Sequence, residues 1–261
     1  MMLLSVEHRS ECGGRKENED SVGFCANETQ GCFVLADGTG GYEGGALASN
    51  SVVGQVLAHF STTPRVDSDV PGTLMMVARE VLYGLRELNP QLPDMNTTLA
   101  TLLLDAERGV AYWNYLGDSR IYLFRNGSAQ SLTTDHSVLQ SMIDAGYCTE
   151  TLRGNHQRNT LYAAVCCDET PENAVHDEPF ALQPGDVFLL CSDGFWENFD
   201  EAVMEEKLRQ AESPEQWIDE MMDEISSLDP SNLDNFSALV VCVGEWEAKT
   251  AGSLPEECRQ E

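Results

Sequence analysis

The segment Val34-Leu-Ala-Asp-Gly-Thr-Gly-Gly-Tyr-Glu-Gly-Gly45 runs from an apolar stretch into an aspartate and then into five glycines. An apolar run that stops at Asp and Gly predicts a buried strand ending at Asp37. The Asp-Gly pair itself has two interpretations. It is a common signal for a hairpin turn, and it is also typical of a ligand site, where glycines let the backbone approach closely.

Four other segments combine a strand-like run with an acidic residue at its end. They are Asp193 after the run 186–191, Asp118 after the run ending at Leu116, Asp234 before the run 237–243, and Glu19 with Asp20 before the run 21–26. If antiparallel strands bring these ends together, the carboxylates cannot all stay ionised without compensation. Each acid alone is explained equally well as a turn or cap residue. Their recurrence at five strand ends favours a site for Mg²⁺ or Mn²⁺, which prefer oxygen ligands, including a carbonyl such as that of Gly38.

Composition excludes several other classes of function. The chain of 261 residues carries 44 acidic and 15 basic residues, a formal charge of −29, which disfavours nucleic acid and anionic membranes as partners. Its nine cysteines include no C-x-x-C pair and none followed six positions later by arginine, so neither a zinc site of that spacing nor a Cys-x5-Arg thiol phosphatase is expected. An odd number of thiols without a signal peptide predicts a reduced, cytoplasmic protein.

The order of hydrophobic runs predicts antiparallel sheets with helices packed outside them, in one domain. After a first strand within 1–10, we expect strands at 21–26, 31–37, 99–105, 110–117, 120–125, 186–191 and 237–243, and helices at about 45–62, 72–88, 137–145, 201–211 and 215–228. Asn126-Gly127 predicts a two-residue hairpin leading into 129–133. We expect the domain to span 1–245 and residues 246–261 to form a polar tail.

Seven short motifs occur in an order that resembles the bacterial members of the PP2C (PPM) family of metal-dependent serine/threonine protein phosphatases. They are R-x-x-N-E-D at 15–20, A-D-G-x-G-G at 36–41, T-T-L at 97–99, G-D-S-R-x-Y-L at 117–123, L-T-x-D-H-S at 132–137, L-L-C-S-D-G at 189–194 and D-N-x-S at 234–237. The resemblance covers about residues 2–243. It implies an α+β fold, a four-layer α-β-β-α sandwich of two antiparallel sheets flanked by helical pairs.

The resemblance also implies a site with two, and in bacterial members three, Mn²⁺ or Mg²⁺ ions. Asp37 would bridge two ions, the Gly38 carbonyl would bind the first, and Asp193 and Asp234 the second. Glu19 and Asp20 would bind a metal or its waters, and Asp118 would help to hold the third ion. Arg15 would bind the substrate phosphate through a bidentate guanidinium, a geometry suited to phosphate.

The implied reaction is hydrolysis of phosphoserine or phosphothreonine by attack of a water held between two metals, without a phosphoenzyme. The implied partners are phosphorylated proteins and a bacterial Ser/Thr kinase, and we expect a monomer. Thr39 stands where animal members have histidine, so a metal-bound water or His136 is left as the donor of a proton to the leaving group. A flap at about 144–160 would border the substrate groove. Two alternatives remain: a catalytically silent binding module, or a hydrolase of a small phosphorylated metabolite.

Overall fold

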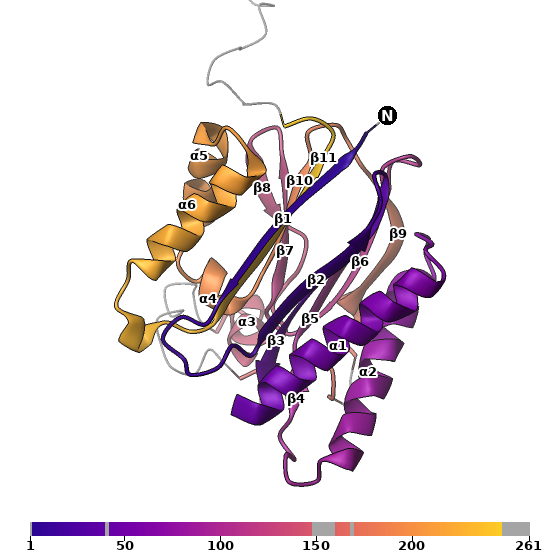
Figure 1. Cartoon of the computed structure of the whole chain (residues 1–261), viewed down its shortest axis with the longest axis vertical. Coiled ribbons are helices and arrows are strands. Elements are labelled where there is room, and N and C mark those ends of the chain that lie inside the picture. The colour runs from indigo at the N-terminus through magenta and orange to yellow at the C-terminus, as the bar shows by residue number, and fades with distance from the viewer. Residues whose placement is uncertain (1, 40–41, 148–159, 168–169, 247–261) are drawn as a thin grey trace, which may run out of the picture.

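A computed structural model describes residues 2–39, 42–147, 160–167 and 170–246, without the side chains of residues 42 and 43. Two antiparallel sheets form the centre of the molecule (Figure 1). One has the order β1-β11-β10-β7-β8, with β1 Leu4–Glu11, β11 Phe236–Val243, β10 Val187–Cys191, β7 Arg120–Arg125 and β8 Ser128–Ser131. The other has the order β2-β3-β5-β6-β9, with β2 Asp20–Ala26, β3 Gln30–Thr39, β5 Leu99–Asp105, β6 Val110–Leu116 and β9 Val175–Ala181; β4 Asn96–Thr97 pairs with the end of β3.

Helices cover both outer faces of the sandwich. The pair α1 Tyr42–Thr62 and α2 Val70–Leu88 lies on the face of the β3 sheet, and the pair α5 Glu201–Gln210 and α6 Pro214–Ser226 lies on the β11 sheet (Figure 1). Two short helices, α3 Val138–Asp144 and α4 Asp193–Trp196, follow β8 and β10. The four-layer α-β-β-α sandwich expected from the sequence is therefore confirmed.

Four layers require three apolar interfaces, and the strands supply them by alternation. In β3, Val34 packs under α1 and α2 while Leu35 packs between the sheets. In β11, Val240 packs under α5 and α6 while Leu239 lies between the sheets. Because successive side chains point to opposite faces and both faces are buried, these strands read as continuous apolar runs.

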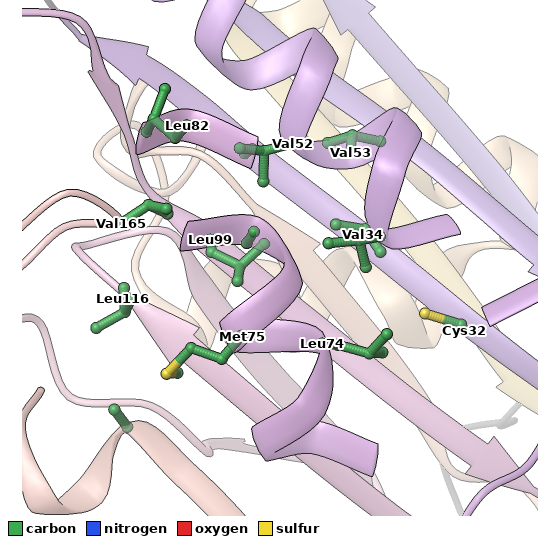
Figure 2. Close-up of a cluster of buried hydrophobic side chains, with 14 of the residues drawn as sticks. Cys32, Val34, Val52, Val53, Leu74, Met75, Leu82, Leu99, Leu116 and Val165 are labelled. Carbon is green, nitrogen blue, oxygen red and sulfur yellow. The ribbon is translucent and has the colours of Figure 1, made fainter. Parts of the chain in front are cut away.

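The interface beneath the first helical pair is closely packed. Val52 and Val53 of α1 and Leu74 and Leu82 of α2 lie over Val34 of the sheet, and all five are less than 5% exposed (Figure 2). Burial of a Val or Leu side chain stabilises a fold by about 1.5–3 kcal/mol. This layer therefore anchors β3, the strand that carries Asp37.

Several elements differ from the sequence prediction. The strand predicted to end at residue 37 continues to Thr39, so Asp37-Gly38 lies inside β3 and the hairpin-turn interpretation of this pair is wrong. β9 and α4 were not predicted. The predicted helix at 137–145 forms as α3, but none of its residues is buried, and Val138 and Met142 of its apolar face are about 40% exposed.

The predicted hairpin at Asn126-Gly127 is confirmed. Arg125 pairs with Ser128 across the turn, and both turn residues have positive φ, 53° and 81°. This is the backbone that a two-residue turn of this kind needs, and Asn-Gly adopts it with little strain. The flap expected at about 144–160 and the tail expected at 246–261 lie largely outside the described residues. Within the described part of the chain, no helix combines the length and apolar character that crossing a bilayer requires.

Candidate active site

The ends of the strands that carry the candidate acids meet at one end of the sandwich, near β4 and α4 and away from the N-terminus (Figure 1). Asp20, the first residue of β2, pairs directly with Asp37 of β3. Arg120 at the start of β7 pairs with Cys191 at the end of β10. Asp118 lies two residues before β7 and Asp193 two residues after β10, so both are next to the same end of this strand pair.

The backbone of Asp37 is fixed by the two threonines of the T-T-L motif. The Asp37 N–H donates to Thr98 Oγ1 at 2.8 Å. The Asp37 carbonyl accepts from Thr97 Oγ1 at 2.9 Å and from the Thr98 N–H at 2.8 Å. Thr98 Oγ1 also lies 2.7 Å from Ser119 Oγ, next to Asp118. Both threonines are buried, so this motif acts by holding two acidic residues in place.

Asn235 joins the loop before β2 to the start of β11. Its Oδ1 accepts from the Glu19 N–H at 2.9 Å, and its Nδ2 donates to the carbonyls of Cys12 and Glu17 at 2.9 and 3.0 Å. These bonds place Glu19 near Asp234, whose side chain accepts from the Asn235 N–H at 2.8 Å. Sequence reasoning did not assign this role to Asn235, although the residue belongs to the D-N-x-S motif.

Two glycines next to the candidate acids, Gly38 of β3 and Gly194 of α4, allow close packing of backbone on backbone. A methyl group at Gly38 would overlap the Gly45 carbonyl, and one at Gly194 would overlap the Asn235 carbonyl. Neither Gly38 nor Gly194 has positive φ. The sequence suggested that these glycines free a carbonyl to turn inward; in the structure, their small size lets the acid-bearing segments touch.

The candidate carboxylates repel one another in a poorly solvated site. Burial, and then the neighbouring carboxylates, raise the pKa of Asp37 and of Asp193 well above the ordinary aspartate value. The four neighbours of Asp37 that contribute are Asp20, Asp193, Asp118 and Asp234, in that order. Burial and Asp135 raise the pKa of Asp118 to about 7. The five predicted aspartates therefore interact electrostatically, as the sequence predicted.

Glu19 and Asp20 belong to the same group of acids. Burial is the main reason that the pKa of Glu19 is raised, with Arg15 opposing and Asp234 adding to the shift. Burial raises the pKa of Asp20 to about 6. Asp20 Oδ2 accepts a hydrogen bond of 2.7 Å from Ser192 Oγ, whereas Asp20 Oδ1 is buried with no donor among the described residues.

These residues fit hard divalent cations. The unsatisfied Asp20 Oδ1 and the raised pKa values both show carboxylates whose charge the protein leaves largely uncompensated. Within the described residues, no three His, Cys, Asp or Glu side chains gather closely enough to surround one ion. Mg²⁺ retains several waters and takes only one or two carboxylates from the protein, so ligands divided between ions are compatible with this arrangement.

Arg15 pairs with a proposed metal ligand in this structure. Its Nη2 donates to Asp234 Oδ2 at 2.6 Å, and its side chain is 51% exposed. The guanidinium therefore lies at the solvent-exposed edge of the acidic site. Because it is half exposed, the ion pair is expected to add little stability.

His136 is an unsuitable proton donor. It is fully buried, and its Nδ1 accepts from the Gly117 N–H at 3.3 Å, which leaves Nε2 to donate to Asn173 Oδ1 at 3.2 Å. Its ring stacks on Tyr115 with 4.6 Å between centroids. Burial lowers its pKa, so the neutral ring is favoured. These contacts support the view that His136 stabilises the turn before α3.

A cleft lies elsewhere, beside the β7–β8 turn and the end of β11, and its lining includes Arg125, Leu208 and Trp246. None of the candidate residues lines it.

The fold and the acidic end together define a four-layer sandwich enzyme of the metal-dependent hydrolase type. The family model for protein phosphatase 2C matches residues 9–234. The chain is 31% identical over 248 residues to the serine/threonine phosphatase stp of Listeria innocua, covering 91% of this chain and 95% of that protein. The chain therefore belongs to the protein phosphatase 2C family.

The chain is also similar to PstP of Mycobacterium tuberculosis, in sequence and in structure. The serine/threonine protein phosphatase PstP is 32% identical over 216 residues, which cover 78% of this chain but 39% of PstP. A crystal structure of PstP/Ppp matches with a TM-score of 0.80 and 28% identity over 93% of this chain and all of that one. The PstP catalytic domain in complex with two manganese ions matches with a TM-score of 0.76 and 28% identity, over 94% of this chain and all of that one.

Proposed function

We propose that the protein is a metal-dependent phosphatase that hydrolyses phosphoserine and phosphothreonine in proteins. The observation that carries the proposal is the meeting of carboxylates from five strand ends, at whose centre burial and the neighbouring carboxylates raise the pKa values of Asp37 and Asp193. The two manganese ions of the PstP catalytic domain support the same assignment. The cofactor of this chain is accordingly Mn²⁺ or Mg²⁺, two ions and a third more weakly bound.

The residue assignments are those that the resemblance to the family implies, and the meeting of the acids supports them. Asp37 lies at the centre of the electrostatic group and is assigned to both principal ions, with the Gly38 carbonyl on the first. Asp193 and Asp234 are assigned to the second ion, and Asp118 to the third. Glu19 and Asp20 bind a metal or the waters of one. Divalent cations bound there would lower the pKa of a water for attack on phosphorus and would neutralise phosphoryl charge.

Arg15 is assigned to the substrate phosphate. Its guanidinium lies at the solvent-exposed edge of the site and offers the planar donors that match two phosphate oxygens. Release of Arg15 from Asp234 would let it orient the phosphoryl group and stabilise the charge that develops on it. Because His136 is buried and both of its ring nitrogens are bonded, we assign the proton for the departing seryl or threonyl oxygen to a water that a metal ion in the site would hold.

The class of substrate follows from the chemistry. Phosphoserine and phosphothreonine in a protein are products of phosphoryl transfer, so a Ser/Thr kinase must supply the substrates of this enzyme. The Listeria relative, which the chain covers almost end to end, is named a serine/threonine phosphatase. We further propose one phosphatase domain over 1–245 that acts as a monomer in the cytoplasm.

The test is hydrolysis of a phosphothreonine peptide with and without Mn²⁺, for the wild type and for the variants Asp37→Asn and Asp193→Asn. Asp177→Asn is the matched control, because Asp177 is exposed on the edge strand β9. We expect Mn²⁺-dependent turnover in the wild type and in Asp177→Asn, and a loss of at least about a hundredfold in the other two, since the proposed metals supply several kcal/mol of transition-state stabilisation.

Other outcomes would favour the remaining candidates. Mn²⁺ binding in calorimetry with no turnover of any phosphopeptide would identify a silent binding module. Faster turnover of a sugar phosphate than of phosphopeptides would identify a metabolite hydrolase. Metal-independent turnover, or full activity of Asp37→Asn, would refute the proposed mechanism.

A further inference from the structure

Arg120, the first residue of β7, is buried and has partners on three sides. Its Nε and Nη2 donate to the two carboxylate oxygens of Asp135, both at 2.8 Å. Its Nη1 donates to Tyr122 Oη at 2.7 Å. Only 7% of the residue is exposed. A bidentate pair of this kind fixes the plane of the guanidinium as well as its position.

The indole of Trp196 covers that guanidinium. Arg120 Cζ lies 3.4 Å from the centroid of the Trp196 ring, and Trp196 is 9% exposed. Stacking of a desolvated guanidinium on tryptophan is the strongest form of the cation–π contact. The plane of the indole is thus set by a cation that is itself fixed by Asp135.

Trp196 links two acid-bearing segments. It is the last residue of α4, whose first residue is Asp193. Its Nε1 donates to the Asp118 carbonyl at 2.9 Å. The strands β7 and β10 already bring these segments together through the pairing of Arg120 with Cys191. The hydrogen bond from the indole is a second connection between the two segments. It lies beyond the paired residues of β7 and β10 and joins α4, which begins with Asp193, to the backbone of Asp118.

Without this bond, Asp118 would be held mainly from the other side. The neighbouring Ser119 Oγ lies 2.7 Å from Thr98 Oγ1, which belongs to the segment that holds Asp37. Asp118 and Asp193 lie next to neighbouring strand ends and carry like charges when ionised, so they repel one another. A rigid connection is therefore needed to keep the two carboxylates at a fixed separation.

We propose that Trp196, held by Arg120, is a positioning residue that sets the separation of the Asp118 and Asp193 carboxylates and thereby the affinity of the site for the divalent cations that these carboxylates would bind. The inference rests on the proposed function, because it takes these carboxylates as metal ligands. Neither Trp196 nor Arg120 is among the residues assigned above to the metal ions or to the substrate phosphate. Residues that orient metal ligands in this way typically change metal affinity by 10–100-fold when they are altered.

Ordinary core packing is the competing explanation, and the chain contains a matched control for it. Trp217 is fully buried, and its Nε1 also donates to a backbone carbonyl, that of Met204, at 3.2 Å. Trp217 lies between α6 and the outer face of the β11 sheet and touches none of the candidate ligands. Trp196→Phe and Trp217→Phe each remove one indole N–H bond and some buried ring.

The experiment compares the full-length wild type with Trp196→Phe, Trp217→Phe and Arg120→Lys. Free Mn²⁺ is counted by electron paramagnetic resonance during titration, stability is measured by urea unfolding in EDTA, and phosphopeptide kinetics are recorded at saturating Mn²⁺. We expect both Phe variants to lose stability in EDTA. Only Trp196→Phe is expected to weaken its lowest-affinity class of Mn²⁺ site, by roughly tenfold, with an unchanged KM for the peptide once Mn²⁺ saturates.

Arg120→Lys provides a second variant if Trp196→Phe does not fold. Lysine retains the positive charge of Arg120. It cannot form the two parallel bonds to Asp135 that orient the Arg120 guanidinium against the indole of Trp196. Its lowest-affinity Mn²⁺ site should weaken as well. Equal Mn²⁺ affinity in Trp196→Phe, Trp217→Phe and the wild type would overturn the positioning role while leaving the proposed function intact. A wild type that binds no Mn²⁺ would overturn the proposed function and this inference with it.

Discussion

Replacement of Asp20 by asparagine should stabilise the protein in the absence of metal. Asp20 is 5% exposed, and one of its carboxylate oxygens has no donor among the described residues. Burial raises its pKa to about 6, with hydrogen bonds from Ser237 and Ser192 opposing the shift and Asp234 adding to it. Asparagine has nearly the same shape and no charge, so it removes the cost of burying a carboxylate.

The magnitude follows from proton linkage. A carboxyl whose pKa is about 6 in the folded state and 3.8 in the unfolded state favours folding fully below pH 3.8, and this contribution is lost as the pH rises through 6. At pH 8 the ionised group lowers the free energy of unfolding by roughly 3 kcal/mol, at 1.36 kcal/mol for each pKa unit. At pH 5 the same calculation gives about half of that.

The assay is urea unfolding of the wild type and of Asp20→Asn in EDTA at pH 8 and pH 5, repeated at pH 8 with excess Mn²⁺. The variant should be more stable by up to about 3 kcal/mol at pH 8 and by about half as much at pH 5. It should also gain less stability than the wild type from Mn²⁺, because ligand binding stabilises only through affinity for the folded state. Destabilisation of the variant by the same amount at both pH values would refute the reasoning.

Three further predictions concern residues outside the metal site. Asp186→Asn should lower the free energy of unfolding by about 2–3 kcal/mol in urea, because Asp186 is buried and bonded twice to Arg125 at 2.7 Å; unchanged stability would contradict this. His136→Asn should reduce the free energy of unfolding because it removes the buried contacts of the ring. The pH at which kcat falls to half its maximum on the acid side should not change, because the buried neutral ring donates no proton to the substrate. A shift of this acid-side pH in the variant would contradict the prediction. Leu82 is fully buried in the layer shown in Figure 2. Leu82→Ala should lower the free energy of unfolding by about 2–5 kcal/mol, measured by thermal or urea unfolding, and should leave the affinity for Mn²⁺ unchanged. A loss of less than about 1 kcal/mol would show that this layer is loosely packed.

Strands buried on both faces were the most predictable part of the fold. The runs that became β5 and β11 are continuously apolar because each faces two hydrophobic layers. β9 was missed because it lies at the edge of its sheet, with mostly exposed side chains and a proline at position 179. Proline lacks the N–H needed in a central strand but is tolerated at an edge, so its presence argues against a strand in a sequence-based prediction.

The acids of the candidate site were recognisable because each lies at a strand boundary, whereas the residues that position them were not. Asn235, Thr98 and Trp196 act through bonds to segments between 60 and more than 200 positions away. No periodicity in the sequence encodes such contacts, which depend on strand order and register. The T-T-L and D-N-x-S motifs showed that these positions matter, but only the structure shows that they hold the backbone of other motifs.

The arrangement of the site explains why acids at strand ends need such support. Asp20 and Asp37 lie within paired strands, whereas Asp118, Asp193 and Asp234 are carried by the connections just outside β7, β10 and β11. Mutual repulsion would separate these connections, because burial prevents water from screening the charges. The structure opposes that tendency with backbone contacts at Gly38 and Gly194, and with side-chain bonds from buried threonine, asparagine and tryptophan to the acid-bearing backbone. The backbone that carries the acids is thus held in place, while a buried carboxylate oxygen such as Asp20 Oδ1 has no donor among the described residues and can accept a divalent cation. The stability that the buried acids cost is supplied by the three apolar layers elsewhere in the sandwich.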